Sequence, residues 1–139
     1  MKPPAAPSAP SARSGLSAIG SAGWWLAAGL YALAIFLLSS QSYPLGVKHL
    51  PFLVDKAIHV LVYGTFSAVL FAALRQSRPR THPWVLSGLA LALAMLYGLS
   101  DEYHQSFIPF RHTEAYDLAA NAVGAVVAQG LVLWSGRMQ

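Results

Sequence analysis

Acidic side chains are confined to three short stretches of the chain. The Asp and Glu residues are Asp55, Asp101, Glu102, Glu114 and Asp117. A histidine, a tyrosine, a side-chain amide or an arginine lies within a few positions of each stretch. A carboxylate beside such groups can move a proton, hold a cation or accept hydrogen bonds from a ligand. These three stretches are therefore the first candidates for a functional site.

The first stretch places Asp55, His59 and Tyr63 at intervals of four residues. On a helix, each step of four residues turns by about 40° from the previous position. The spacing therefore predicts one polar stripe that runs from a helix end toward the middle of the helix. The same stripe is compatible with structural hydrogen bonds between neighbouring helices.

The second stretch gathers its polar residues within one helical turn. Asp101 precedes His104 and Gln105 by three and four residues, and Glu102 precedes Gln105 by three. Residues at these spacings are neighbours on one helix face. Taken alone, the pattern is equally typical of a solvated helix end that enters a loop.

In the third stretch, Glu114, Asp117, Asn121 and Gly124 recur at steps of three and four residues. This predicts a helix face on which a carboxylate and an amide point inward and a glycine lets another backbone approach. Asp117 lies in an otherwise apolar segment, where an ionisable side chain normally faces the protein interior. A purely structural pair of Asp117 with an arginine or a histidine is the alternative.

The loop between the second and third stretches, residues 106–113, carries Arg111. A guanidinium can bind a phosphate or a carboxylate through two parallel hydrogen bonds. Arg111 therefore predicts either an anion-binding contact or the neutralisation of Asp101 or Asp117.

Membrane-spanning helices are the elements that would position these residues. The chain has 139 residues, of which 55% are hydrophobic and 10% charged, against about 25% charged in soluble proteins. Four apolar segments have the length of about 20 residues that a membrane helix needs. We expect an all-α membrane protein with four transmembrane helices in a compact bundle. The predicted spans are 23–41, 56–75, 83–105 and 114–134, in one domain (23–136) after a disordered Pro/Ala/Ser-rich tail (1–22).

Lysine and arginine predict the orientation. Six of the nine fall on the side shared by the tail, the second loop and the C-terminus, namely Lys2, Arg13, Arg75, Arg78, Arg80 and Arg137. Cytoplasmic loops carry the excess of positive charge. Both termini are therefore predicted to be cytoplasmic, and the acidic residues to face outward.

Composition also excludes several kinds of chemistry. Cysteine is absent, which rules out disulfides, cysteine nucleophiles, thiolate zinc sites and iron–sulfur clusters. No HExxH or similar ligand spacing occurs, so neither a metal nor another cofactor is expected. The net charge of +4 fits membrane orientation better than nucleic-acid binding. Four short helices without broken paired spans leave little room for a transporter.

Two segments resemble the signature of VanZ-like membrane proteins, a family named after an accessory factor in resistance to the glycopeptide teicoplanin. The resemblance covers residues 31–134, with Ala128 where the family often has glycine. The segments are Asp55-Lys56-x-x-His59-x-x-x-Tyr63 and Asp101-Glu102-x-x-Gln105-x-Phe107-x-x-x-Arg111-x-x-x-x-x-Asp117-x-x-x-Asn121-x-x-Gly124.

The resemblance implies a small multi-pass protein of the bacterial cytoplasmic (inner) membrane. Family members are linked to reduced binding of glycopeptides or lipoglycopeptides at the cell envelope, a form of antibiotic resistance, without a settled biochemical activity. Carried over by position, the candidate ligand-binding residues are Asp55, Lys56, His59, Tyr63, Asp101, Glu102, Gln105, Arg111, Asp117 and Asn121.

Together these patterns predict a polar pocket at the outer face, where the second, third and fourth spans converge. Arg111 and Lys56 would contact an anionic lipid headgroup or a lipid-linked envelope precursor. The expected partners are the lipid bilayer and such a ligand, with no nucleic acid and an oligomeric state that the sequence leaves open.

Whether the protein is an enzyme stays open at this stage. The alternative is a membrane-embedded acid/base enzyme that acts on a lipid-linked substrate, with Glu102 or Asp117 as base and His59 or His104 as acid. A third possibility is a structural scaffold whose polar residues only fix the register of the helices.

Overall fold

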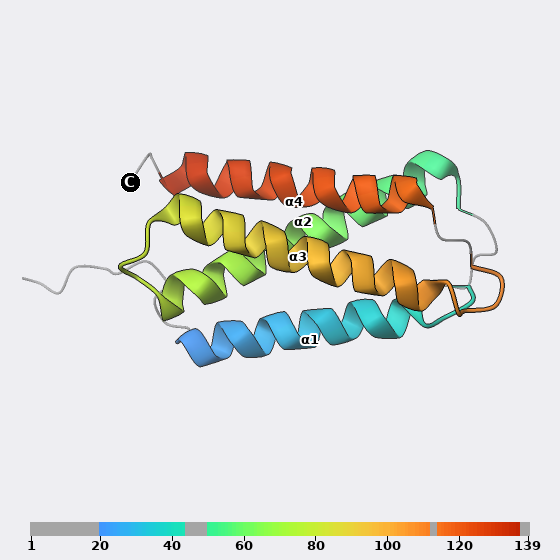
Figure 1. Cartoon of the computed structure of the whole chain (residues 1–139), viewed down its shortest axis with the longest axis horizontal. Coiled ribbons are helices and arrows are strands. Elements are labelled where there is room, and N and C mark those ends of the chain that lie inside the picture. Colours follow the sequence, from blue (N-terminus) through green and yellow to red (C-terminus); the bar gives the residue numbers. More distant parts are fainter. Residues whose placement is uncertain (1–19, 44–49, 112–113, 137–139) are drawn as a thin grey trace, which may run out of the picture.

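The computed structural model describes residues 20–43, 50–111 and 114–136. Within these ranges the chain forms four helices: α1 (Ser21–Ser39), α2 (Phe52–Ser77), α3 (Pro83–Gln105) and α4 (Ala115–Gly136). They pack side by side as a bundle, with consecutive helices running in opposite directions (Figure 1). The predicted all-α, four-helix fold is confirmed. Of the predicted tail, residues 1–19 lie outside the described ranges, and residues 21 and 22 belong to α1.

All four helices are long and apolar enough to cross a membrane. A helix rises 1.5 Å per residue, so about 20 residues span the hydrocarbon core. The outward faces of the bundle are also apolar. Large side chains that are more than half exposed occur on every helix, for example Leu26, Leu61, Leu96 and Leu131. Since such a surface suits acyl chains rather than water, the chain is a multi-pass protein of a lipid bilayer.

Proline and histidine mark two of the helix starts. Pro51 caps α2, and Pro83 is the first residue of α3, where the missing N–H costs no intrahelical hydrogen bond. The His82 side chain accepts a hydrogen bond from the Trp84 backbone N–H. Because α2 begins at Phe52, before the predicted start at residue 56, Asp55 lies in its first turn.

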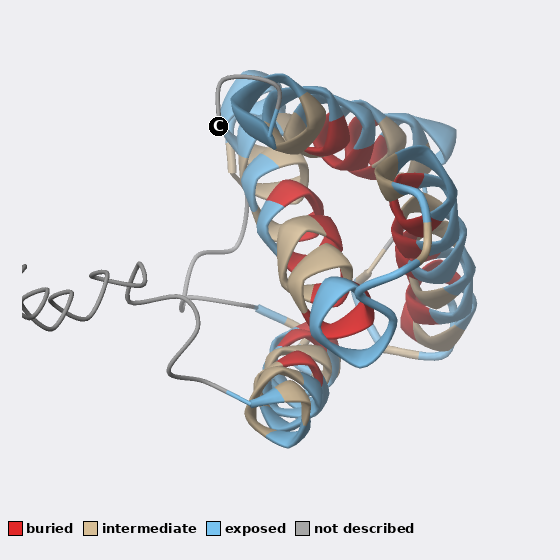
Figure 2. Ribbon diagram, turned by 90° about the vertical axis from the view of Figure 1, so that its left-hand side faces the viewer, coloured by how far each residue is buried: buried red, intermediate tan, exposed pale blue. Residues whose placement is uncertain are grey.

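The second helix organises the bundle. It contacts α1, α3 and α4, whereas α1 touches α3 only lightly. The buried residues lie on the faces that the helices turn toward one another (Figure 2). The apolar core is built around Tyr63, Phe66, Leu70, Leu86, Ala90 and Ala94.

Glycine brings α2 and α4 into close contact. A Cβ atom on Gly124 would lie 2.1 Å from the carbonyl oxygen of Val60, and one on Gly64 would lie 3.0 Å from the carbonyl oxygen of Gly124. Small residues allow this approach of two helix backbones in a membrane. The predicted role of Gly124 as a point of backbone approach matches this geometry.

One end of the bundle collects the acidic residues. There α1 and α3 end and α2 and α4 begin, on the right in Figure 1. All the Asp and Glu residues of the chain lie in the adjoining turns or just before α4, and we call this region the acidic end. Arg75, Arg78 and Arg80 lie at the opposite end. The side of the membrane that each end faces stays a prediction.

Candidate functional site

The first group of polar residues at the acidic end surrounds Lys56. Its ammonium nitrogen lies 2.8 Å from Asp55 Oδ2 and 2.9 Å from Glu114 Oε2, and it also contacts Asp117 Oδ1. We call these four residues the Lys56 cluster. Asp117 is buried and Glu114 is exposed, so the cluster extends from the bundle interior to its surface. Three carboxylates share a single ammonium group.

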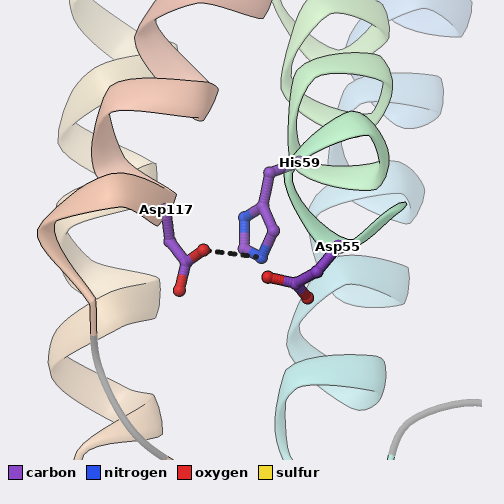
Figure 3. A group of neighbouring side chains, drawn as sticks. All are labelled: Asp55, His59 and Asp117. Carbon is purple, nitrogen blue, oxygen red and sulfur yellow. Dashed lines mark ion pairs between the residues drawn. The ribbon is translucent and has the colours of Figure 1, made fainter. Parts of the chain in front are cut away.

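His59 lies one turn beyond this cluster on α2. Its Nδ1 is 3.0 Å from Asn121 Oδ1, and its Nε2 is 3.6 Å from Asp117 Oδ1 (Figure 3). Asn121 is fully buried. An amide oxygen only accepts hydrogen bonds, so His59 donates through Nδ1 and turns Nε2 toward Asp117. Asp55, His59 and Asp117 each offer a potential ligand atom within 4.8 Å of the others.

The second group is a chain of hydrogen bonds that begins at Tyr63. The Tyr63 hydroxyl donates to Asp101 Oδ2 at 3.0 Å, and Gln105 Nε2 donates to the same oxygen at 3.0 Å. Gln105 Oε1 in turn accepts from Arg111 Nη2 at 2.5 Å. We call these four residues the Asp101 network. Two neutral donors stabilise a buried carboxylate here.

The Asp101 network ends in a tight turn. Phe110 adopts a φ of 65°, a left-handed conformation that is uncommon for a bulky residue. The Arg111 backbone N–H donates to the Ile108 carbonyl oxygen at 3.2 Å. The turn brings the Arg111 side chain back to Gln105. Among the described residues Arg111 forms no ion pair, and it contacts neither Asp101 nor Asp117 directly.

The two groups border one cavity of about 230 Å³ between α1, α2 and α3. Its polar wall is formed by Asp55, His59, Tyr63, Asp101, Gln105 and Arg111. Its apolar wall is formed by Ile35, Leu38, Leu50, Ile58 and Val62, and Ser39 adds a hydroxyl. The part of this wall that α1 supplies is absent from the sequence prediction, which has only the other three helices converging. The polar Ser39 at the end of an apolar span is the one signal that points to it.

Gly98 holds α3 close to both groups. A Cβ atom at this position would lie 3.0 Å from Tyr63 Cε1 and 3.3 Å from Asn121 Nδ2. Any larger residue would press on a side chain of each group. No sequence pattern singles out Gly98, because its function depends on which side chains of other helices it faces.

Glu102 is a buried carboxylate that accepts no hydrogen bond from any described residue. It is 8% exposed, and neither of its oxygens has a hydrogen-bond partner in the described part of the chain. It interacts electrostatically with Asp117 and Asp101. A buried polar group without a partner is costly and rare. The Nδ2 atom of Asn121 is buried and unpaired in the same way.

His104 lies apart from both groups. Its Nε2 is 3.0 Å from the Ser40 hydroxyl, and its ring centroid is 4.7 Å from that of Phe36. It therefore faces α1 and does not line the cavity. Of the two histidines considered as proton donors, only His59 adjoins the cavity and the acidic residues.

The structure thus places nine of the ten predicted site residues in two groups. The α4 side holds Asp55, Lys56, His59, Asp117 and Asn121, and the α3 side holds Tyr63, Asp101, Gln105 and Arg111. Among the described residues, Glu102 forms no hydrogen bond with either group and interacts with Asp117 and Asp101 only electrostatically. Glu114 joins the first group as an additional residue outside the predicted set.

Comparison with known proteins bears on the whole bundle. No curated protein and no solved structure matches the chain. Residues 17–136 match a protein family described as VanZ/LLP1, a range that contains all four helices and both polar groups. The chain therefore belongs to the VanZ/LLP1 family.

Proposed function

We propose that this protein binds the anionic headgroup of an envelope lipid, or of a lipid-linked envelope precursor, in the cavity at the acidic end. The observation that carries the proposal is the position of Arg111. Its guanidinium borders the cavity and contacts an amide oxygen of Gln105 instead of a carboxylate. Within the described ranges, most of its N–H donors therefore have no partner, and their planar arrangement fits a phosphate.

In this proposal Lys56 has a structural role, although its positive charge led to the expectation that it contacts the headgroup. It contacts three carboxylates and is not among the residues that border the cavity. Its charge is already compensated inside the protein. The proposal therefore assigns the phosphate to Arg111, and it assigns Lys56 to holding α2 and α4 together through Asp55 and Asp117.

The carboxylate of Asp101 restricts the chemical types of headgroup that the cavity would bind. It borders the same cavity as Arg111. A carboxylate repels a phosphate, but it accepts hydrogen bonds from hydroxyl groups. A headgroup that carries both a phosphate and hydroxyls, such as a phosphosugar or a phosphoglycerol, complements Arg111 and Asp101 together.

The apolar wall and the size of the cavity support a lipid ligand. Ile35, Leu38, Ile58 and Val62 face the same space as the polar residues. The volume of about 230 Å³ is smaller than the roughly 300–1,000 Å³ of typical small-molecule pockets. The cavity therefore accommodates part of a headgroup, while the hydrocarbon chain stays in the bilayer.

The proposal places the protein in the bacterial inner membrane with its acidic end outward. The arginines at the opposite end of the bundle support this orientation, because cytoplasmic loops carry excess positive charge. A headgroup covered by the protein would be less accessible to a glycopeptide or a lipoglycopeptide. This would connect the cavity to antibiotic susceptibility.

Native mass spectrometry tests the binding step directly. The full chain is purified in mild detergent beside Arg111→Ala and Arg78→Ala, the latter an exposed arginine at the opposite end. We expect wild type and Arg78→Ala to retain a phosphate-containing lipid that Arg111→Ala loses. Because Arg111 lies outside the helices, helix content by circular dichroism should not change. Equal lipid retention in all three proteins would refute the proposal.

A cellular assay separates binding from folding. Alanine variants of Asp101 and Arg111 should abolish any change in glycopeptide susceptibility that the wild-type protein confers. Their abundance in the membrane should stay at the wild-type level. A parallel loss of abundance would support the scaffold alternative instead.

One observation favours catalysis as a second candidate function. His59 Nε2 faces Asp117 at 3.6 Å, which is an arrangement suited to proton transfer. Glu102 is buried and has no donor among the described residues. Turnover of the lipid identified above, followed by chromatography, distinguishes the two functions. An enzyme would convert the lipid and lose this activity in His59→Ala, whereas a binding protein would release it unchanged.

A further inference from the structure

The α4 side of the acidic end contains potential metal ligands that do not contact the headgroup in the proposal above. Asp55, His59 and Asp117 each offer one ligand atom, and these atoms lie within 4.8 Å of one another. Figure 3 shows the imidazole between the two carboxylates. We propose that these three side chains bind a divalent transition-metal ion that accepts mixed nitrogen and oxygen ligands, Zn²⁺ or Mn²⁺.

The helices hold the three ligands in a fixed arrangement. Asp55 and His59 are separated by four residues on α2, so that they project from the same face in successive turns. Asp117 comes from the first turn of α4. The close packing of Gly124 against Val60 fixes the distance between these two helices. The ligand set is therefore built on rigid elements and not on a loop.

The orientation of His59 is the strongest indication of a cation. Asn121 Oδ1 accepts from His59 Nδ1 at 3.0 Å, which is how a second residue commonly orients a metal-binding histidine. In the neutral imidazole, Nε2 then presents a lone pair to the oxygen of Asp117 at 3.6 Å. Asp117 Oδ1 also contacts the Lys56 ammonium, so a metal ion held by His59 Nε2 and Asp117 would compete with that ammonium for the oxygen. Ligands at zinc–ligand distances in a tetrahedral arrangement are about 3.3–3.6 Å apart.

The charges around this point leave room for a divalent cation. Asp55, Glu114 and Asp117 contribute three negative charges, and Lys56 contributes one positive charge. With His59 neutral, one positive and three negative charges give these residues a net charge of −2. A divalent ion would bring this sum to zero, and Lys56 could remain paired with the exposed Glu114.

Glu102 provides an independent indication from α3. It is 8% exposed, both of its oxygens lack a partner in the ranges that the structure describes, and its largest electrostatic interaction is with Asp117. A buried carboxylate beside another carboxylate is stabilised by a cation nearby. Glu102 thus adds a buried carboxyl group from a third helix, α3.

Three protein ligands leave at least one coordination position open. Structural zinc sites are normally filled by four protein ligands, whereas sites that bind a water molecule or a substrate have three. Of the three ligands, Asp55 and His59 also border the cavity described above, whereas Asp117 does not. Metal binding itself requires no lipid, and it can therefore be tested whether or not the headgroup proposal is correct.

The test uses the full chain in nanodiscs after treatment with EDTA. ZnCl₂ and MnCl₂ are titrated separately and binding is followed by isothermal titration calorimetry. We expect one ion per chain. Asn121→Ala should weaken binding by about 10- to 100-fold, as loss of a residue that orients a metal ligand typically does. His59→Ala should weaken it further.

Two controls keep the result interpretable. His104→Ala removes a histidine that contacts Ser40 instead of the ligand set, so the affinity should not change. Lys56→Gln removes the ammonium that competes for Asp55 and Asp117, so the affinity should rise. Co²⁺ in place of Zn²⁺ should give an absorption band in the visible range that is lost in His59→Ala.

Three results would overturn the proposal that a metal ion binds to these side chains. Binding that is absent in the wild type, or equal in wild type and His59→Ala, would overturn the proposal. If Lys56 is the only cation that the cluster binds, Lys56→Gln should lower membrane abundance and bind no metal, which would also overturn it. Circular dichroism of each variant shows whether the bundle is folded.

Discussion

Gly124 of α4 lies against Val60 of α2 so closely that a Cβ atom on the glycine would fall 2.1 Å from the Val60 carbonyl oxygen. Val60 directly follows His59, and Gly124 lies about one helical turn after Asn121. The contact between two backbones therefore determines the distance over which His59 and Asn121 form their hydrogen bond of 3.0 Å. A packing contact and a hydrogen bond between two candidate site residues are parts of the same helix interface.

Gly124→Ala should consequently destabilise the bundle. The added methyl group meets backbone atoms of Val60, which cannot move without shifting α2. Overpacking of this kind costs about 1–3 kcal/mol of unfolding free energy, occasionally more. The matched control is Gly130→Ala on the same helix, where a Cβ atom meets nothing within 4 Å. SDS-driven unfolding in mixed micelles should show a loss for Gly124→Ala and none for Gly130→Ala, and similar curves would contradict the assigned contact.

The polar stripe on α2 shows how far sequence reasoning reaches. The spacing of Asp55, His59 and Tyr63 predicts one common face, and helix geometry gives it a drift of about 80° over the two steps. In the bundle this drift directs His59 to Asn121 on α4 and Tyr63 to Asp101 on α3. Helical periodicity therefore indicates which residues face inward, but not which helix each one meets.

The partners themselves depend on packing that leaves no local trace in the sequence. Lys56 reaches Glu114 and Asp117, 58 and 61 residues further along the chain. Gly98 makes room for Tyr63 and Asn121, although nothing in its own neighbourhood marks it. Membership of the VanZ/LLP1 family and the four spans could be recognised from the sequence, because both depend on residue types at fixed spacing. The part of the cavity wall that α1 supplies could not, because it depends on how α1 packs against α2.

Tyr63→Phe should weaken the Asp101 network without changing its shape. Tyr63 is 1% exposed and its hydroxyl donates to Asp101 at 3.0 Å. Without it, the buried carboxylate retains Gln105 as its only donor among the described residues. A hydrogen bond to a charged group contributes about 1.5–3 kcal/mol, so the unfolding free energy should fall by that order. Tyr103→Phe, at a position 70% exposed, is the control and should behave like wild type.

Arg111→Lys tests whether the shape of the guanidinium matters in addition to its charge. A lysine keeps the positive charge but cannot form two parallel hydrogen bonds to one phosphate. The loss of one charge-assisted hydrogen bond, about 1.5–3 kcal/mol, corresponds to roughly 10- to 100-fold weaker binding. Lipid retention in native mass spectra should thus lie between that of wild type and that of Arg111→Ala. Retention equal to wild type would mean that charge alone attracts the headgroup.

Glu102→Gln should stabilise the metal-free protein at alkaline pH. The buried Glu102 carboxylate has no donor in the described part of the chain, and an unpaired buried polar group costs about 1–3 kcal/mol, more when it is charged. Glutamine has the same shape, carries no charge and adds N–H donors. Glu114→Gln is the matched control, because it removes an exposed partner of Lys56 and should lower stability by about 1 kcal/mol or less. In thermal unfolding, we expect the melting temperature to rise for Glu102→Gln and to fall slightly for Glu114→Gln. A lower melting temperature for Glu102→Gln would show that the carboxylate is already stabilised inside the protein.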